Sequence, residues 1–243
     1  VGQRVHAGDQ IKVNGRLVRW SATARTPRDA EGYTMLEVYL NSLTLPPDAP
    51  AIVNLDDPKE KERVPLMRQQ PHVLGARFYF QPAIAKWLND GTADWFWPLA
   101  ERLEIPVMMN VPTVLSDVAK VAARYPNLKI IIDHMGRLRG MKDGTFKLDK
   151  TIALAKYPNV HVKLTLIQAC SSDSYPYRNI HPEVHRLIDA FSPRRSFWGT
   201  DLSRSPYSYK QNITMFTEEI PWLSADDKIS IMGQGICDWI GWK

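Results

Sequence analysis

At 243 residues and 44% apolar content, the chain is long enough to bury one large core, and we treat residues 1–243 as a single domain. It contains no run of ~20 uninterrupted apolar residues, and two cysteines are too few for a disulfide framework, which argues against membrane and secreted proteins and favours a cytoplasmic one. The 31 basic and 26 acidic side chains are scattered without a basic stripe, which argues against nucleic-acid binding and favours a small anionic substrate as partner.

The first 50 residues do not follow the pattern of the rest of the chain. The stretch IKVNGRLVRW (11–20) predicts a hairpin with Asn14 and Gly15 in its turn, because Asn-Gly suits the two-residue turns that join antiparallel strands. The stretch EGYTMLEVYLNSLTLPP (31–47) predicts a helix that ends at its two prolines. We therefore expect a divergent N-terminal segment over 1–50.

From residue 51 onward, short apolar strands alternate with longer amphipathic stretches, a pattern typical of repeated βα units and a parallel sheet. Several of these strands are apolar on both faces, as strands covered on both sides must be. The predicted strands cover 51–56, 74–80, 105–111, 129–135, 160–166 and 196–202. The predicted helices cover 57–70, 92–104, 114–126, 146–158, 182–193 and 224–242, the last with Ser224 as its N-cap.

The joints between these units repeat, as RYPNLKIIID (124–133) and KYPNVHVKLT (156–165) show. Pro126 and Pro158 cannot continue a helix and so help to fix where the next strand begins. Six alternating strands are typical either of a doubly wound sheet or of most of a (β/α)8 barrel, and the lack of a G-x-G-x-x-G turn favours the barrel. We predict an α/β fold, a distorted (β/α)8 TIM-type barrel whose first one or two βα units are atypical or incomplete.

Nearly every predicted strand ends in polar residues at the same relative position. Because ligands bind at the carboxyl ends of the strands in parallel α/β folds, we expect these side chains to meet there. The residues are Arg77 with Tyr79, Asn110, Asp133 with His134, Lys163 with Thr165, and Thr200 with Asp201 followed by Arg204. The loop SSDSYPYRN (171–179) adds Tyr175, Tyr177 and Arg178 as candidates for substrate contact.

Five segments carry a family resemblance: GARF, IPVMMNVP, YPNLKIIIDHMG, YPNVHVKLT and FSPRRSFWGTDLSR. They resemble successive segments of the amidohydrolase superfamily, specifically the amidohydrolase-2 group that contains lactonases and decarboxylases, over roughly residues 51–242. The resemblance implies a distorted barrel with a hydrolytic site at its mouth, and it places His134 at the sixth strand and Asp201 at the eighth. In that family the Asp accepts a proton from an attacking water while the His orients or polarises it, so both residues are expected to be catalytic.

The pattern of metal ligands departs from that of the zinc-holding family members. Those members usually place H-x-H at the end of the first strand and another His at the fifth, whereas here Asn110 occupies the fifth-strand position and His6 has no partner two residues away. Zinc sites need three or four ligands, and only His134 and Asp201 are well placed. We therefore expect no metal cofactor, with one divalent metal such as zinc as the alternative.

Some lactonase-like members of the group are thought to work without a metal, using Asp, His and basic residues. By that resemblance, cationic and polar donors hold a substrate carboxylate or the tetrahedral oxyanion. The expected binding residues are Arg77, Asn110, Lys163, Arg204, Tyr177 and Arg178. Other interpretations stay open, since Arg77 can instead pair with a structural acid and Lys163 can lie at the sheet rim with its stem buried. Asp133 is expected to orient His134 or to cap the next loop.

We therefore expect a lactonase-like hydrolase that acts on a small carboxylated lactone or a related cyclic ester. One alternative is a metal-dependent decarboxylase of the same superfamily, which the missing first-strand histidines disfavour. Another is a catalytically inactive, truncated barrel. A partial barrel would expose a sheet edge and apolar helix faces, so a homodimer is expected unless residues 1–50 cover the gap.

Overall fold

The computed structural model describes residues 10–13, 16–19, 53, 55–57, 59–67, 74–80, 84–137, 146–201, 205 and 207–241. The predicted hairpin is confirmed, because β1 (Gln10–Val13) and β2 (Arg16–Arg19) pair in antiparallel register. The predicted helix over 31–47 lies outside the described residues.

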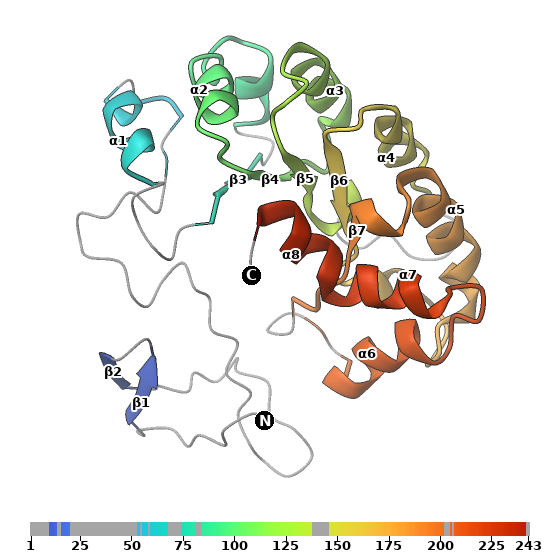
Figure 1. The fold of residues 1–243 in the computed structure, drawn as a ribbon. Coiled ribbons are helices and arrows are strands. Elements are labelled where there is room, and N and C mark those ends of the chain that lie inside the picture. Colours follow the sequence, from blue (N-terminus) through green and yellow to red (C-terminus); the bar gives the residue numbers. More distant parts are fainter. Residues whose placement is uncertain are drawn as a thin grey trace.

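Five short strands form one parallel sheet in the order of the sequence, and they follow an arc in Figure 1. The strands are β3 (Ala76–Tyr79), β4 (Val107–Asn110), β5 (Ile130–Ile132), β6 (Val160–Lys163) and β7 (Ser196–Phe197). Each strand pairs with the next, as Val107 does with Ile130 and Ile130 with Val160. Parallel neighbours need a crossover between them, and helices supply it here, so the predicted α/β alternation is confirmed.

Helices follow the strands along the chain. They are α1 (Glu60–Met67), α2 (Phe96–Arg102), α3 (Leu115–Arg124), α4 (Asp149–Ile152), α5 (His181–Phe191), α6 (Tyr209–Thr217), α7 (Ala225–Ile229) and α8 (Gly235–Ile240). In Figure 1, α2 to α5 lie on the outer side of the arc, and α7 continues into α8 through a π-helical stretch, Ser230–Gln234. Within the described ranges, no helix combines the length and apolar character needed to cross a membrane.

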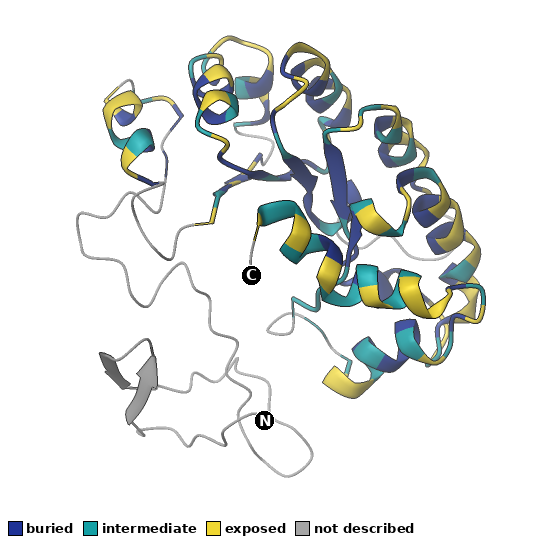
Figure 2. Ribbon diagram, in the orientation of Figure 1, coloured by how far each residue is buried: buried dark blue, intermediate teal, exposed yellow. Residues whose placement is uncertain are grey.

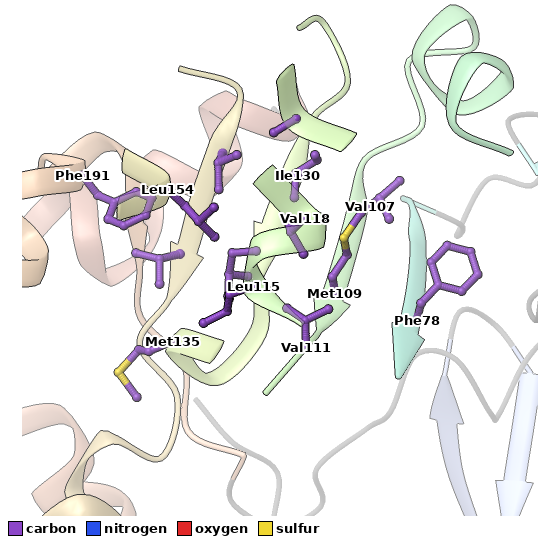
Figure 3. Packing of buried hydrophobic residues seen from close by; sticks show 14 of the residues in the cluster. Phe78, Val107, Met109, Val111, Leu115, Val118, Ile130, Met135, Leu154 and Phe191 are labelled. Atoms are coloured by element: carbon purple, nitrogen blue, oxygen red, sulfur yellow. The ribbon is translucent and has the colours of Figure 1, made fainter. Parts of the chain in front are cut away.

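The core lies between the sheet and the outer helices, where Figure 2 shows the dark blue of buried residues on both layers. Alternate residues of each strand point to this side, and Figure 3 shows Val107 and Met109 of β4 beside Leu115 and Val118 of α3. A fully buried side chain of this kind contributes roughly 1.5–3 kcal/mol to folding. The outer face of the sheet is therefore packed against the helices. The residues that alternate with these core positions lie on the inner face.

The last helix covers part of that inner face. The indole ring of Trp239 lies 4.8 Å from the ring of His161 on β6 and 5.7 Å from Phe197 on β7, measured between ring centroids. Lys129, just before β5, donates through its ammonium group to the backbone carbonyl of Trp239 at 2.6 Å. These contacts fix α8 against the amino-terminal part of the sheet.

The repeated Tyr-Pro-Asn turns close the helices as the sequence predicts. Asn159 in the second turn donates its side-chain amide to the carbonyls of Ala122, Tyr125 and Leu128 at 2.9 to 3.3 Å. These carbonyls lie around the end of α3, where they have no helical partners, so one side chain satisfies several backbone groups at once.

One predicted strand is wrong. The residues described within 51–56 form no strand, although Val53 and Leu55 are buried. The carbonyl of Leu55 accepts a hydrogen bond from the indole nitrogen of Trp95 at 2.8 Å instead of pairing with a strand. A short apolar run indicates burial, but it does not fix the backbone conformation.

The structure adds α6, which the pattern of apolar residues did not predict. Ser208 opens it by accepting a hydrogen bond from the Gln211 amide at 3.2 Å, while the Gln211 side chain accepts one from the Ser208 amide at 3.2 Å. This Ser-x-x-Gln pattern is a capping box, which was the available signal. The predicted N-cap Ser224 is confirmed at the start of α7, where its hydroxyl accepts from the Asp227 amide at 3.1 Å.

Candidate active site

The polar residues predicted at the strand ends converge at one edge of the sheet. Asp133 and His134 begin a 3-10 turn directly after β5, Lys163 is the last residue of β6, and Asp201 follows β7 by four residues. Arg77 reaches the same place from β3. Neighbouring parallel strands end at the same edge, which brings together residues that are far apart in the sequence.

Several backbone angles at this edge are unusual. His134, Met135 and Asp201 have positive φ angles of 50°, 56° and 49°. Each such residue costs of order 1–3 kcal/mol and persists only where the surroundings fix it. Here the Thr151 hydroxyl donates to the Met135 carbonyl at 2.6 Å, and Gly136, at φ 63°, lies so close to Leu115 that a Cβ would approach its Cδ2 to 2.7 Å. The packing beneath the turn thus sets the direction of the imidazole.

Asp133 is the electrostatic centre of the site, and its side chain is fully buried. Its Oδ2 accepts hydrogen bonds from Arg77 Nη2 at 2.5 Å and Nε at 3.2 Å, and its Oδ1 lies 3.4 Å from Lys163 Nζ. Burial alone would raise the pKa of Asp133, but the charges of Lys163, His134 and Arg77 outweigh burial and hold the pKa below its usual range. The carboxylate is therefore ionised, and it joins β3, β5 and β6.

His134 stands between Thr165 and the two carboxylates. Its Nδ1 lies 2.7 Å from the Thr165 hydroxyl, and its Nε2 lies 3.4 Å from Asp133 Oδ2 and 3.8 Å from Asp201 Oδ2. Burial lowers the pKa of His134, and the opposing effect of Asp133 and Asp201 does not restore it, so the ring is neutral near pH 7. The side chains of His134 and Asp201 remain 14% and 15% exposed, which leaves both open to a small molecule.

The remaining predicted binding residues lie in different surroundings. Asn110 ends β4 opposite Tyr79 and is buried. Tyr177 is also buried, with Tyr207 in edge-to-face contact at 5.0 Å. Arg178 is exposed and pairs with Glu219 rather than with the cluster around Asp133. Arg204 lies outside the described residues.

Two residues gain from the geometry a role that the sequence did not specify. Thr165 appeared only as a polar strand end, yet its hydroxyl contacts the imidazole of His134. Gly199 lies against Thr165 and Lys163, where a Cβ would come within 2.6 Å of Thr165 Cγ2 and 3.2 Å of Lys163 Cε. The Gly-Thr-Asp sequence after β7 was the available signal, since an isolated glycine near a strand marks close backbone approach.

The donor atoms do not fit a tightly held metal. No group of three His, Cys, Asp or Glu side chains with the geometry of metal ligands occurs in the part of the chain that the structure describes. Asp133, the carboxylate nearest to His134, is already paired with two cations, Arg77 and Lys163, which would repel a metal ion. We therefore derive no catalytic step through a metal.

Comparison with known proteins gives a curated relative that matches part of the chain. The chain is 29% identical over 105 residues to an L-fucono-1,5-lactonase from Burkholderia ambifaria. This alignment covers 42% of the chain and 36% of the lactonase, so the chain matches about a third of that protein's length.

Solved structures share the fold. An amidohydrolase from Burkholderia multivorans with bound zinc has a TM-score of 0.64 at 20% identity, and the match covers 77% of this chain and 71% of that one. A probable 2-pyrone-4,6-dicarboxylic acid hydrolase from Acinetobacter baumannii with bound citric acid has a TM-score of 0.59 at 18% identity, over 79% of this chain and 72% of that one. The predicted barrel-type α/β fold is therefore confirmed.

A family model described as amidohydrolase matches residues 36–234, a span that contains the whole five-stranded sheet and the residues around Asp133. The chain therefore belongs to the amidohydrolase family, as the DHMG and WGTD segments predicted.

Proposed function

We propose that this chain hydrolyses a small carboxylated lactone, or a related cyclic ester, with a water molecule activated by Asp201 and His134. The observation that carries the proposal is the placement of the His134 imidazole and the Asp201 carboxylate, whose Nε2 and Oδ2 atoms are 3.8 Å apart. Two atoms at that separation are too far apart for a direct hydrogen bond, but both can contact one water molecule.

The proposed reaction begins with that water. Its oxygen attacks the lactone carbonyl carbon while Asp201 accepts one of its protons, and the Nε2–H of neutral His134 donates a hydrogen bond to the reacting oxygens. The tetrahedral intermediate then expels the ring oxygen, which breaks the ring C–O bond. Asp201 returns the proton to this leaving oxygen, so that the product is a hydroxy acid and the enzyme is regenerated.

The two cations at the site suit an anionic substrate. The side chains of Arg77 and Lys163 are 38% and 27% exposed, so each can face a bound molecule while contacting Asp133. A guanidinium and an ammonium in a partly dry site bind a carboxylate, and they stabilise negative charge that develops on a carbonyl oxygen. Asn110, Tyr177, Arg178 and Arg204 remain predicted binding residues.

The relatives support the substrate class. The curated relative acts on a sugar lactone, and one structural neighbour is named as a probable hydrolase of a dicarboxylated pyrone, which is also a cyclic ester. A neutral His134, whose pKa is lowered by burial, is the form that the proposed reaction uses near neutral pH. No nucleic acid, membrane or metal enters the proposed reaction.

The test is hydrolysis of a panel of aldonolactones and carboxylated 2-pyrones, followed by acid release. We expect turnover by the parent protein and a loss of at least ~100-fold in kcat for Asp201→Asn, because the amide keeps the shape and removes the base. The matched control is Asp189→Asn, since this aspartate is exposed on α5 and pairs only with His185 in the described contacts. Parental activity in Asp201→Asn, or no turnover by the parent across the panel, would contradict the proposal.

A further inference from the structure

Thr165 occupies a buried position directly beside the imidazole. It follows β6 by two residues, is 1% exposed, and places its hydroxyl oxygen 2.7 Å from His134 Nδ1. The backbone before it is held in place, because the Leu164 amide donates to the Phe197 carbonyl at 2.7 Å and so extends the pairing of β6 with β7. Thr165 therefore follows directly on a residue that is hydrogen-bonded to β7.

The direction of this hydroxyl is fixed by packing. The methyl group of Thr165 lies against the backbone of Gly199, so close that a Cβ there would approach Thr165 Cγ2 to 2.6 Å. A β-branched side chain has few χ1 rotamers, and exchanging the positions of its methyl and hydroxyl groups would put the methyl against the imidazole. Packing against Gly199 thus turns the hydroxyl toward His134.

The partners of the ring decide where its proton lies. His134 Nε2 faces the carboxylates of Asp133 and Asp201, which accept hydrogen bonds but cannot donate them when ionised. A neutral ring therefore carries its proton on Nε2, and Nδ1 becomes an acceptor for the Thr165 hydroxyl. Each polar atom of the ring then has a complementary neighbour, and the opposite tautomer would direct a lone pair at two negative charges.

We propose that Thr165 is a positioning residue that holds His134 in the Nε2–H tautomer and aims this N–H toward Asp201 and the reacting water. The inference rests on the proposed function for its kinetic consequence, but the tautomer can be measured without any substrate. Thr165 itself does not touch the reacting atoms.

Removal of the hydroxyl should act on the chemical step. Thr165→Val keeps the shape and deletes the donor, so the ring loses the contact that fixes its rotation. We expect kcat to fall about tenfold with little change in KM, since one neutral hydrogen bond is involved and the substrate-binding cations are unchanged. Thr165→Ser restores the hydroxyl and should recover most of the lost kcat. Thr217→Val is the control, because that hydroxyl on α6 donates to a backbone carbonyl, that of Ile213.

The direct readout is nuclear magnetic resonance of the histidine ring nitrogens in protein labelled with 15N-histidine. The chain has six histidines, and the His134 signals are those lost in His134→Asn. At about pH 8, above the usual histidine pKa of ~6.5, we expect the couplings of His134 to show a proton on Nε2 in the parent and in Thr165→Ser. Thr165→Val should show both tautomers.

A proton on Nδ1 of His134 in the parent protein would overturn the inference without any variant. So would a Thr165→Val protein that keeps the parental tautomer and the parental kcat. If the parent hydrolyses no lactone, the proposed function fails, while the ring-nitrogen spectra of the parent and of the two Thr165 variants still decide the role of Thr165.

Discussion

Gly199 shows how one missing side chain can shape the site. The residue lies two positions after β7, and it leaves room for the Thr165 methyl group and the stem of Lys163, which an added Cβ would meet. Its φ angle does not require glycine, so the reason for glycine here is space and not backbone freedom. Glycine at position 199 thus allows the chain after β7 to lie close to the end of β6.

Replacement of this glycine should therefore overpack the site. In Gly199→Ala the new Cβ would lie 2.6 Å from the methyl group of Thr165, a stiff side chain that cannot easily move aside. We therefore expect the free energy of unfolding, measured in urea, to fall by about 1–3 kcal/mol. The control is Gly233→Ala, where an added Cβ meets nothing within 4 Å. Equal stability of the two variants would show that the strand end moves to make room.

At the scale of elements, Asp133 links three strands that do not all pair with one another. It belongs to the turn after β5. It binds Lys163 of the neighbouring strand β6 and Arg77 of β3, which is separated from β5 by β4. A buried carboxylate needs such partners, because an uncompensated charge in the interior is costly. On the inner face of the sheet, ion pairs thus connect the ends of the strands. On the outer face, apolar packing against the helices stabilises the same strands.

Arg77→Met should destabilise the fold by about 2 kcal/mol, less than for a fully buried pair because Arg77 is partly exposed. The control Arg178→Met removes an exposed arginine paired with Glu219 and should cost less than about 1 kcal/mol. The pKa of Asp133 is lowered, so the stabilisation by Arg77 is present above the ordinary aspartate value of 3.8 and is lost as the pH falls through the folded-state pKa. If the difference in the free energy of unfolding between the parent and Arg77→Met stayed the same in acid, it would contradict this role of the Arg77–Asp133 pair.

The sequence predicted the five strands of the sheet because their apolar runs have strand length and lie between clear helix ends. The strand predicted over 51–56 was wrong. Val53 and Leu55 are buried, but the Leu55 carbonyl accepts its hydrogen bond from the indole of Trp95. The prediction also missed α6, whose start is marked by a capping box and not by apolar periodicity. Burial is thus easier to predict from a sequence than the hydrogen bonds that accompany it.

The same limit applies to the site. His134 and Asp201 could be predicted to meet, because parallel strands bring their carboxyl ends to one edge. The contact between Thr165 and His134 could not, since it depends on a rotamer that is fixed by Gly199. The burial of Tyr177 depends on the path of the loop after β6, which no local pattern specifies.

At the scale of the whole molecule, the inner face of the sheet has a layer of aromatic side chains around His161, below the site. His161 of β6 stacks on Phe197, with ring centroids 5.3 Å apart, and faces Trp239 of α8. Burial, with a smaller contribution from Arg195 and Lys129, lowers the pKa of His161 to about 4. Protonation of this ring would put a charge into an aromatic environment next to two cations.

His161 should therefore make the fold sensitive to acid. The unfolded chain binds a proton at His161 near its ordinary value of 6.5, and the folded chain only near 4, so stability falls as the pH drops from 6.5 to about 4. The full effect is about 3 kcal/mol. We expect His161→Leu to flatten this part of the stability curve, measured by urea unfolding between pH 7 and about 4. An unchanged pH dependence would assign the acid sensitivity to other groups.

The strands β5 and β6 carry Lys129 and His161 toward one end and Asp133 and Lys163 toward the other. The end that carries Lys129 and His161 is packed against α8 and lies away from the candidate site, so substitutions there can change stability without changing the site. Substitutions around Trp239 should alter heat resistance and leave the residues around His134 in place, whereas changes in the loops at the opposite end should alter which molecules reach His134 and Asp201. In laboratory evolution, this chain could be screened for the two properties in separate libraries.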